Sequence, residues 1–399
     1  MKPVIQSPQD PAFVQDPYPF YARMQAGDPV RFWQDYDMPA VFDPALINAL
    51  LRDRRLGRVP PGGPVSAPAH MQDFYRIEHH SMLEQEPPTH TRLRGLVLRA
   101  FTSRRIAALA PDIDQICDSL LTALPHDTVD LLPAYCAQVP VRIIARLLGV
   151  PEGMSSQLLQ WSNQMVAVYQ AGCDFETQCR ANAAARDFSA FLSGYIDQRR
   201  HSPADDLISH LIAAQTDGQS LSPDEMIATC ILLLNAGHEA TVHTLGNGVH
   251  ALLRHGWHPD WLAPGQIDTT IEEILRFDPP LHIFTRYLYE DMTVGRHPLA
   301  AGQQIALVLG AAGVEQPHRF DPMRPRPGHA AFGGGLHFCV GAPLARLELR
   351  IALQKLFAHF PEMALTQAPR YADIYHFHGL TALHVAPHGR AAHGPPWHP

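Results

Sequence analysis

The chain has 399 residues, of which 46% are hydrophobic and 18% are charged, so a large packed core is possible and global disorder is excluded. At this length it can form two or three domains or one large enzyme fold. Its 31 Lys and Arg residues stand against 39 Asp and Glu residues. The resulting net charge of −8 argues against wholesale binding of nucleic acid or of an anionic membrane surface.

The cysteines and the N-terminus indicate a cytoplasmic protein. Six cysteines are too few and too scattered for a disulfide framework, and none of them forms the CxxC pair of a zinc ribbon. The N-terminal residues have neither the apolar core nor the cleavage site of a signal peptide. The apolar stretches are shorter than the roughly 18 residues that a membrane span needs. We therefore expect no membrane attachment.

Most of the chain has helical periodicity, with apolar residues at i, i+3 and i+4. Residues 141–151 predict a helix that stops at a glycine and a proline. Residues 205–216 predict a second helix, followed by a turn at Asp217 and Gly218. A longer helix begins at residues 222–225, where a cap, a proline and two acids stand together, and continues past Asn247. It is apolar nearly all round over four residues, which predicts a helix through the centre of the protein.

The remaining segments predict a small β region. Strand-like pieces occur at residues 31–33, 292–294, 304–308 and 380–385. Residues 58–88 are rich in Pro, Gly and His and predict a long surface loop, and such loops are often lids or binding loops. Neither an internal repeat nor a linker divides the chain. We therefore predict a single, mainly α domain with a minor β region over residues 1–399.

The most informative segment is AFGGGLHFCVGAPLARLELRIALQKLF, residues 331–357. A glycine-rich loop presents Cys339, Gly341 follows, and a helix begins directly afterwards. The helix dipole and the free backbone N–H groups at a helix N-terminus stabilise a thiolate. Glycines let the backbone approach a flat or bulky object closely. The alternative is a buried structural cysteine at a corner of the chain, but the glycines and the helix start favour a thiolate site.

Phe332, Gly335, Cys339 and Gly341 match the pattern F-x-x-G-x-x-x-C-x-G, which resembles the haem-binding loop of cytochromes P450. The resemblance implies the cytochrome P450 fold, with a large helical region, a long central helix and a small β region. It extends over residues 10–387, and residues 388–399 are expected to form a flexible tail. It also implies haem b as cofactor, bound through Phe332 and Gly341, with Cys339 as the thiolate ligand of the iron. Such ligation favours O–O cleavage in P450s.

Glu273 and Arg276 are neighbours on one helix face because they are spaced i, i+3. Alone, this spacing is typical of a surface ion pair. It also resembles the E-x-x-R of cytochromes P450, where the pair is buried and takes a second arginine from a later P-x-R-F motif. That motif implies Arg319, with Arg324 as the alternative. The implied role is to hold the cysteine loop in shape, and a buried pair must be fully hydrogen-bonded to offset its desolvation.

Four further residues match the positions that contact the haem propionates in P450s. His90 and Arg94 lie on one helix face at i, i+4, so both can reach one anionic edge. Arg286 and His337 match the other two propionate contacts. Taken singly, each is typical of a solvated side chain, and their order along the chain is what favours the cofactor role.

Residues 236–241 resemble the A-G-x-[DE]-T-T segment of the family's central helix. The resemblance implies that Ala236 and Gly237 lie against the haem, that Glu239 is the acid of a proton relay, and that the helix opens there. Ala240 departs from the pattern, because it stands where the family has a threonine that orders a water molecule.

Three explanations remain open for Ala240. A substrate hydroxyl with an ordered water can replace the lost group, or Thr241 can reach in. Otherwise the chain is a P450-fold haem protein with a peroxide-driven or non-oxygenase activity, or with a ligand-binding role. Another class of enzyme is excluded here: His238, Glu239 and His243 resemble the zinc-protease H-E-x-x-H, but histidines five residues apart lie roughly 140° apart around a helix and cannot share one metal ion.

The resemblance implies a monooxygenase that inserts one atom of O2 into a small to medium-sized organic substrate. Polar side chains favour a substrate with a carboxylate, hydroxyl or amine group. We expect His79, His80 and Met82 to cover the pocket. The residues expected to line it are Leu232, Asn235, Ala236, Leu281, His282, Phe284, His376 and Phe377.

No flavin or ferredoxin module accompanies the haem segment, so we expect a monomer that receives electrons from a separate ferredoxin or flavodoxin with its reductase, or that bypasses them with peroxide. A basic docking patch is expected on the thiolate side, and scattered solubilising charges are the alternative. The arginines of this patch are Arg99, Arg104, Arg105, Arg346 and Arg350. Gly313 departs from the family, which often has Asn there.

Overall fold

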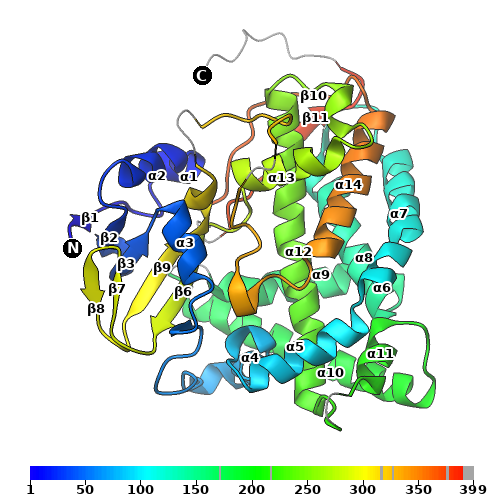
Figure 1. Cartoon of the computed structure of the whole chain (residues 1–399). Coiled ribbons are helices and arrows are strands. Elements are labelled where there is room, and N and C mark those ends of the chain that lie inside the picture. Colours follow the sequence, from blue (N-terminus) through cyan, green and yellow to red (C-terminus); the bar gives the residue numbers. More distant parts are fainter. Residues whose placement is uncertain (170–171, 216–217, 315–317, 326–327, 374–376, 390–399) are drawn as a thin grey trace.

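The computed structural model describes residues 1–169, 172–215, 218–314, 318–325, 328–373 and 377–389. The predicted residues Thr216, Asp217 and His376 therefore lie outside the described residues, as does most of the expected C-terminal tail. Figure 1 shows a large helical region beside a smaller region that contains the main sheet and the N-terminal helices.

Helices form most of the structure, as the sequence predicts. They are α1 (Pro11–Gln15), α2 (Tyr18–Gln25), α3 (Pro44–Leu50), α4 (Gln72–Glu78), α5 (Thr89–Ala100), α6 (Ser103–Ala108), α7 (Ala110–Ala123), α8 (Gln138–Leu148), α9 (Ser155–Val166), α10 (Phe175–His201), α11 (Leu207–Ala213), α12 (Pro223–Arg254), α13 (Ile267–Phe277) and α14 (Ala342–His359). None of the described helices is both long enough and apolar enough to cross a membrane.

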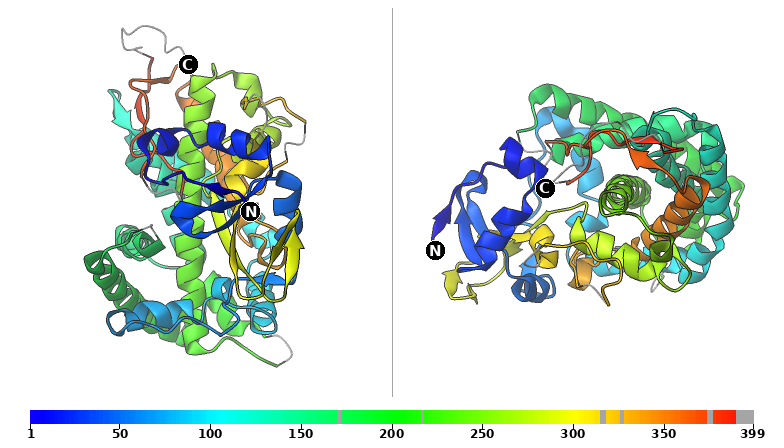
Figure 2. Two further views of the ribbon diagram at one scale, coloured as in Figure 1. Left: turned by 90° about the vertical axis from the view of Figure 1, so that its left-hand side faces the viewer. Right: turned by 90° about the horizontal axis from the view of Figure 1, so that it is seen from above.

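The predicted central helix is confirmed as α12. Ser222 caps its N-terminus in a capping box with Glu225. Viewed from above in Figure 2, α12 is seen end-on with other helices around it. It contacts α8, α9, α13 and α14. The long helix is therefore the element against which the segments of the site are arranged.

The strands lie in three sheets. They are β1 (Pro3–Val4), β2 (Val30–Trp33), β3 (Met38–Val41), β4 (Leu56–Gly57), β5 (Val129–Asp130), β6 (Ile283–Leu288), β7 (Met292–Val294), β8 (His297–Leu299), β9 (Gln304–Val308), β10 (Ala364–Leu365) and β11 (His384–Ala386). The main sheet has the order β1-β2-β3-β9-β6-β4, and the smaller ones are β10-β11-β5 and β7-β8. Apolar residues on both sides of β9 are buried, so this strand lies inside the sheet region.

The predicted strands at residues 31–33, 292–294 and 304–308 are confirmed as β2, β7 and β9. The helix predicted over residues 141–151 is confirmed as α8, which ends where Gly149 adopts a left-handed φ of 77°. The last predicted strand is shorter than expected, because β11 begins at His384 and Leu380 makes only an isolated bridge to Tyr371. The helix expected to reach Thr216 ends at Ala213.

The prediction of a plain surface loop over residues 58–88 is wrong for its middle part. Short 3-10 turns at Ala69–Met71 and Met82–Glu84 flank α4. Phe74 and Ile77 of α4 are 2% and 5% exposed, and α4 packs against α10 and α12. The i, i+3 spacing of these two residues is a helical signal that the surrounding Pro and Gly residues concealed.

Candidate active site

Cys339 lies directly before the N-terminus of α14. Its own N–H donates to the carbonyl of Phe332 over 3.0 Å. Burial raises the pKa of the Cys339 thiol, while backbone N–H groups of Gly341 and Ala342 and the charge of Arg94 act in the opposite direction. The protein groups alone therefore do not produce the thiolate. A bound metal cation deprotonates a coordinating thiol, so the Cys339 sulfur suits a metal ligand better than a free nucleophile.

Two glycines give the cysteine loop its shape. Gly333 and Gly335 adopt φ angles of 67° and 65°, which L residues rarely adopt. A Cβ on Gly335 would lie 2.3 Å from the carbonyl oxygen of Leu51. The close approach at this glycine is therefore to the chain after α3.

The four predicted propionate contacts belong to one cationic cluster with a fifth member, Arg58. The rings of His90 and His337 have centroids 4.4 Å apart, and Arg94 Nη2 donates to the carbonyl of Phe338, the next residue after His337, over 2.7 Å. Arg286 is 3% exposed, and its guanidinium and that of Arg58 both lie within 6 Å of the Phe284 ring centre.

The cationic cluster already holds one carboxylate. Glu86 Oε1 accepts hydrogen bonds from the backbone N–H of Arg58 over 2.6 Å and from His337 Nε2 over 3.2 Å. Buried Nδ1 of His90 and buried Nε of Arg58 have no hydrogen-bond partner among the described residues. Burial lowers the pKa of His90 to about 4 and that of Arg286 to about 10. Additional carboxylates beside these groups would satisfy the open donors, so the cluster fits the propionates of a haem.

Sequence reasoning missed Arg58 and Glu86. Glu86 stands directly before the prolines that precede α5, which was a usable signal because the predicted propionate contact His90 follows four residues later. Arg58 follows the two-residue strand β4, and nothing in the local sequence indicates that it is turned toward Phe284.

The ion pair of α13 is buried, with side-chain exposures of 1% for Arg276 and 0% for Glu273. Both Arg276 Nε and Nη2 donate to the Glu273 carboxylate over 2.7 Å. Arg324 Nε adds a third hydrogen bond over 3.2 Å. The prediction of Arg319 as the second arginine is wrong, and the alternative Arg324 holds the position. Arg319 contributes its backbone carbonyl, which accepts from Arg276 Nη2 over 2.6 Å, while its side chain is exposed.

Gly313 shows why this chain departs from the family at that position. Its carbonyl accepts a hydrogen bond from Arg276 Nη1. A Cβ on Gly313 would lie 2.3 Å from the carbonyl oxygen of Arg276. The absence of a side chain therefore lets this segment pack directly on the end of α13.

In α12, Ala236 is exposed, although its neighbours Asn235 and Gly237 are half-buried and Leu234 and His238 are buried. The space that a side chain on Gly237 would need is filled by Ile144 of α8, 2.9 Å away, so this glycine serves helix packing here. The Thr241 hydroxyl donates to the Gly237 carbonyl over 2.7 Å, and α12 is continuous through this segment. The expected opening of the helix is therefore not seen.

Glu239 lies between two histidines of the same helix. Its Oε1 is 3.2 Å from His243 Nε2 and its Oε2 is 3.7 Å from His238 Nδ1. Burial alone would raise the pKa of Glu239, but the hydrogen bonds and charges of the two imidazoles outweigh it and hold this pKa well below its usual range. Both histidines therefore face one carboxylate, and His243 is the one within hydrogen-bond distance of it.

Several predicted pocket residues are half-buried and adjacent to these segments. Leu281 pairs with Phe377 in an antiparallel bridge. Phe284 lies under Arg58 and Arg286 and would be 3.6 Å from a Cβ on Gly333. Leu232 and Asn235 lie on α12, where the Asn235 amide reaches Met165 Sδ at 3.9 Å.

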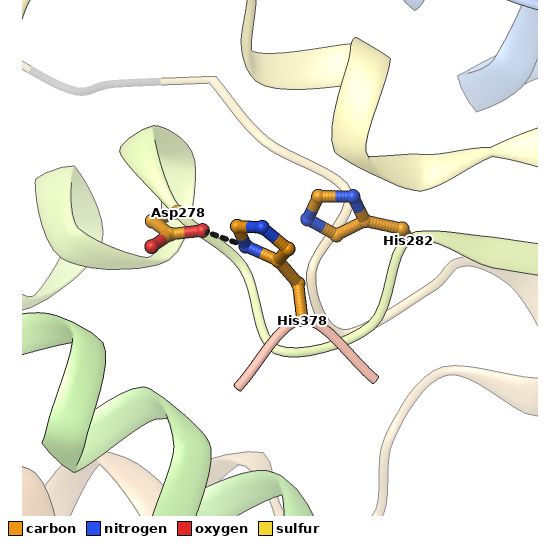
Figure 3. Close-up of side chains that lie close together, drawn as sticks. All are labelled: Asp278, His282 and His378. Carbon is orange, nitrogen blue, oxygen red and sulfur yellow. Dashed lines mark hydrogen bonds and ion pairs between the residues drawn. The ribbon is translucent and has the colours of Figure 1, made fainter. Parts of the chain in front are cut away.

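His282 is a wrong prediction for the pocket, because it is fully buried elsewhere. Its Nδ1 is 2.8 Å from the hydroxyl of Tyr21, and its ring stacks on His378 with centroids 4.5 Å apart (Figure 3). Asp278 accepts hydrogen bonds from His378, Tyr18 and Tyr371. His282 therefore belongs to a buried cluster of aromatic and polar side chains, and the local sequence gave no sign of that cluster.

Asp278, His282 and His378 are metal-binding residue types whose ligand atoms lie within 4.8 Å of one another. However, both carboxylate oxygens of Asp278 already accept hydrogen bonds, and Figure 3 shows the two imidazole rings side by side. The two rings stack with an interplanar angle of 29°, and the lone pairs of an imidazole lie in its ring plane rather than toward the neighbouring ring. The arrangement is therefore a hydrogen-bonded network.

The three residues expected to cover the pocket, His79, His80 and Met82, lie in two different environments. Met82 is 6% exposed and belongs to the core of the helical region. His79 and His80 line a surface hollow of about 710 Å³ between α4 and the chain before it. Met82 is therefore a core residue, and only the two histidines belong to a surface.

The five arginines of the expected docking patch also differ in exposure and in their hydrogen-bond partners. Arg105 turns inward to the carbonyls of Arg99 and Ala100. Arg346 pairs with Glu272, and Arg350 with Asp268. Arg99 and Arg104 are exposed.

The family model "Cytochrome P450" matches residues 154–259 and 267–377. The chain is 39% identical over 370 residues to "Vitamin D(3) 25-hydroxylase" of Pseudonocardia autotrophica. The matched residues cover 88% of each of the two chains. It is 36% identical to "Cytochrome P450 monooxygenase PikC" of Streptomyces venezuelae, over 90% of this chain and 87% of the relative. The solved structure of P450BioI in complex with an acyl-ligated acyl carrier protein superposes with a TM-score of 0.87 at 31% identity, covering 94% of this chain and 99% of that one.

The chain belongs to the cytochrome P450 family and is a P450 monooxygenase. Proteins of this family bind haem b. They act on small-molecule substrates and receive electrons from a redox partner.

Proposed function

We propose that this chain is a haem-thiolate monooxygenase in which Cys339 binds the iron of haem b. The position of the Cys339 sulfur supports this most strongly. It lies at the N-terminus of α14, is half-buried, and faces two backbone N–H groups and Arg94, but burial outweighs these groups and keeps the pKa of the thiol raised. When bound, the haem supplies O2 activation, and a thiolate ligand favours O–O cleavage.

The residues that would hold the cofactor come from four parts of the chain. His90, Arg94, Arg286 and His337 would bind the propionates, and the donors that lack partners in this cluster support the assignment. Ala236 and Gly237 of α12, with Phe332 and Gly341 of the cysteine loop, would lie against the haem. The exposure of Ala236 in the middle of a long helix supports its place there.

Proton delivery is proposed to run through Glu239 with help from the substrate. The pKa of Glu239 lies below its usual range, so its carboxylate is ionised and accepts hydrogen bonds from donors beside it. Ala240 offers no hydroxyl, and the hydroxyl of Thr241 already donates to Gly237. This engagement favours a substrate hydroxyl with an ordered water over Thr241 as the replacement.

The substrate is proposed to be a small to medium-sized organic molecule with a hydroxyl, carboxylate or amine group. The names of the relatives, a vitamin D(3) hydroxylase and a P450 bound to an acyl carrier protein, support a molecule of that size. We further propose a cytoplasmic monomer of one domain that receives electrons from a separate ferredoxin or flavodoxin with its reductase.

Oxygen-isotope labelling tests this function. The protein is supplied with NADPH, a ferredoxin and its reductase under ¹⁸O2, with vitamin D3 and hexadec-9Z-enoic acid as probes. We expect a product with one ¹⁸O atom that disappears when ferredoxin is omitted. A product formed only with added peroxide, or none with either oxidant, would contradict the proposal and favour the peroxide-driven or ligand-binding alternative.

A further inference from the structure

The contact between Glu239 and His243 has a defined direction. The pKa of Glu239 lies below its usual range, so its carboxylate can only accept. Nε2 of His243, 3.2 Å from Glu239 Oε1, must therefore carry the hydrogen. On the other side, His238 Nε2 lies 3.3 Å from the carbonyl of Ala137 and donates to it. Both histidines are thus held in place, and His243 is the one that donates to the acid.

The C-terminal segment at residues 377–379 keeps the His243 ring in place. A Cβ on Gly379 would lie 1.8 Å from His243 Nδ1 and 2.3 Å from its Cε1, so the backbone of Gly379 lies against the imidazole edge. The ring of Phe377 lies with its centre 5.7 Å from that of His243. The side chain of His243 is 9% exposed, so this position leaves the ring little freedom to turn.

This part of the chain is itself anchored to α12 and to the end of α13. His378 Nδ1 donates to Asp278 over 2.6 Å (Figure 3), and its N–H donates to the carbonyl of Pro280 over 2.8 Å. Asn247, one turn beyond His243 on α12, donates to the carbonyl of His378 over 2.9 Å. The Asp278 network therefore fixes the residues that hold His243.

We propose that His243 is a positioning residue for proton delivery, whose Nε2–H holds the Glu239 carboxylate in one orientation. The glycine at 379 is required because any side chain there would displace the imidazole. The inference rests on the proposed role of Glu239. The proposed function thereby gains a hydrogen-bond donor, the Nε2–H of His243, on the helix where Ala240 lacks the hydroxyl of the family pattern.

Four variants and one control test the proposal. Glu239→Gln removes the charge, and His243→Asn removes the donor at Nε2. His243→Gln restores an amide N–H near that place, because its longer side chain reaches as far as Nε2. Gly379→Ala displaces the ring without altering α12. His210→Gln is the control, since His210 is a half-buried histidine on α11 that pairs with Asp205.

The decisive readout is the infrared C–O stretch of the reduced, CO-bound protein, which responds to charge on the distal side and needs no substrate. We expect the band to shift in Glu239→Gln, and to shift in the same direction in His243→Asn and Gly379→Ala. We expect it to remain in place in His243→Gln and His210→Gln. Turnover of hexadec-9Z-enoic acid should fall about tenfold in His243→Asn and Gly379→Ala, the size of effect that follows the loss of a hydrogen bond to a charged group. It should fall about 10²-fold in Glu239→Gln, which removes the relay group itself. The haem content of each variant shows that it has folded.

The outcomes separate the two proposals. An unchanged band and rate in Glu239→Gln would overturn the proposed role of Glu239, whatever His243 does. A shift in Glu239→Gln without one in His243→Asn and Gly379→Ala would overturn the positioning role alone. The same follows if His243→Gln or the control shifts as much as His243→Asn.

Discussion

The cysteine side of the site and the α12 side are built in different ways. Around Cys339, backbone N–H groups, positive-φ glycines and the half-buried Arg94 and Arg346 form the arrangement, and the cysteine loop keeps the family pattern. On α12, side chains form it, and the chain departs from the pattern at Ala240 and surrounds Glu239 with two imidazoles. The comparison indicates that backbone geometry constrains the cysteine side, whereas the α12 side can change one side chain at a time.

The largest effect should come from the buried ion pair on the cysteine side. Glu273→Gln leaves the guanidinium of Arg276 buried without its carboxylate, and we expect a loss of about 3–5 kcal/mol in the free energy of unfolding. Urea unfolding followed by circular dichroism measures it. Arg319→Ala is the matched control, because the exposed side chain is not used, and it should change stability by less than about 0.5 kcal/mol. Equal losses in the two variants would contradict the assignment.

On the α12 side, Ala240→Thr restores the hydroxyl of the family pattern. If the substrate and a water now perform its role, the added side chain should disturb them and raise the hydrogen peroxide released per NADPH oxidised. The effect should be smaller than the roughly 10²-fold loss of turnover expected when the proposed proton-relay group is removed, as in Glu239→Gln. An unchanged peroxide yield with a substrate that turns over would argue against substrate-assisted delivery.

The cationic cluster should show itself in the pH dependence of the haem-free protein. Burial lowers the pKa of His90 to about 4, against 6.5 for the ordinary group. Between these values the unfolded imidazole binds a proton and the folded one does not, so stability falls as the pH falls from about 6.5 to 4. Melting temperatures measured across this range test this. His90→Gln should make the melting temperature depend less on pH. A variant whose melting temperature falls as steeply as that of the wild type would contradict the role of His90.

The smallest effect should come from charge reversal at the exposed arginines of the expected docking patch. Arg99 and Arg104 are exposed, whereas Arg105 is turned inward, so the charge reversals belong at the first two positions. Arg99→Glu with Arg104→Glu should slow electron transfer from ferredoxin up to about tenfold at low ionic strength, and less as salt is added. Arg23→Glu on α2 is the control. An electron-transfer rate that depends on neither the charge reversals nor the salt concentration would contradict the docking patch.

What the sequence predicted depends on how local each signal is. The cysteine loop, the cap of α12 and β9 were predicted because consecutive residues carry them. Arg319 was chosen over Arg324 by a short motif, although which guanidinium reaches Glu273 is decided by the path of the chain between them. His282 was assigned to the pocket by position, but tyrosines from α2 and His378 from the C-terminal segment surround it, and no local pattern shows such distant neighbours. Arg58 was missed for the same reason.

The account depends on the sulfur of Cys339 binding the haem iron, and the absorption spectrum of the reduced, CO-bound protein tests that most directly. The wild type and a Cys173→Ala control should give the red-shifted Soret band of a thiolate-ligated haem. Cys339→Ala should lose that band. A Cys339→Ala protein with an unaltered band would contradict the account.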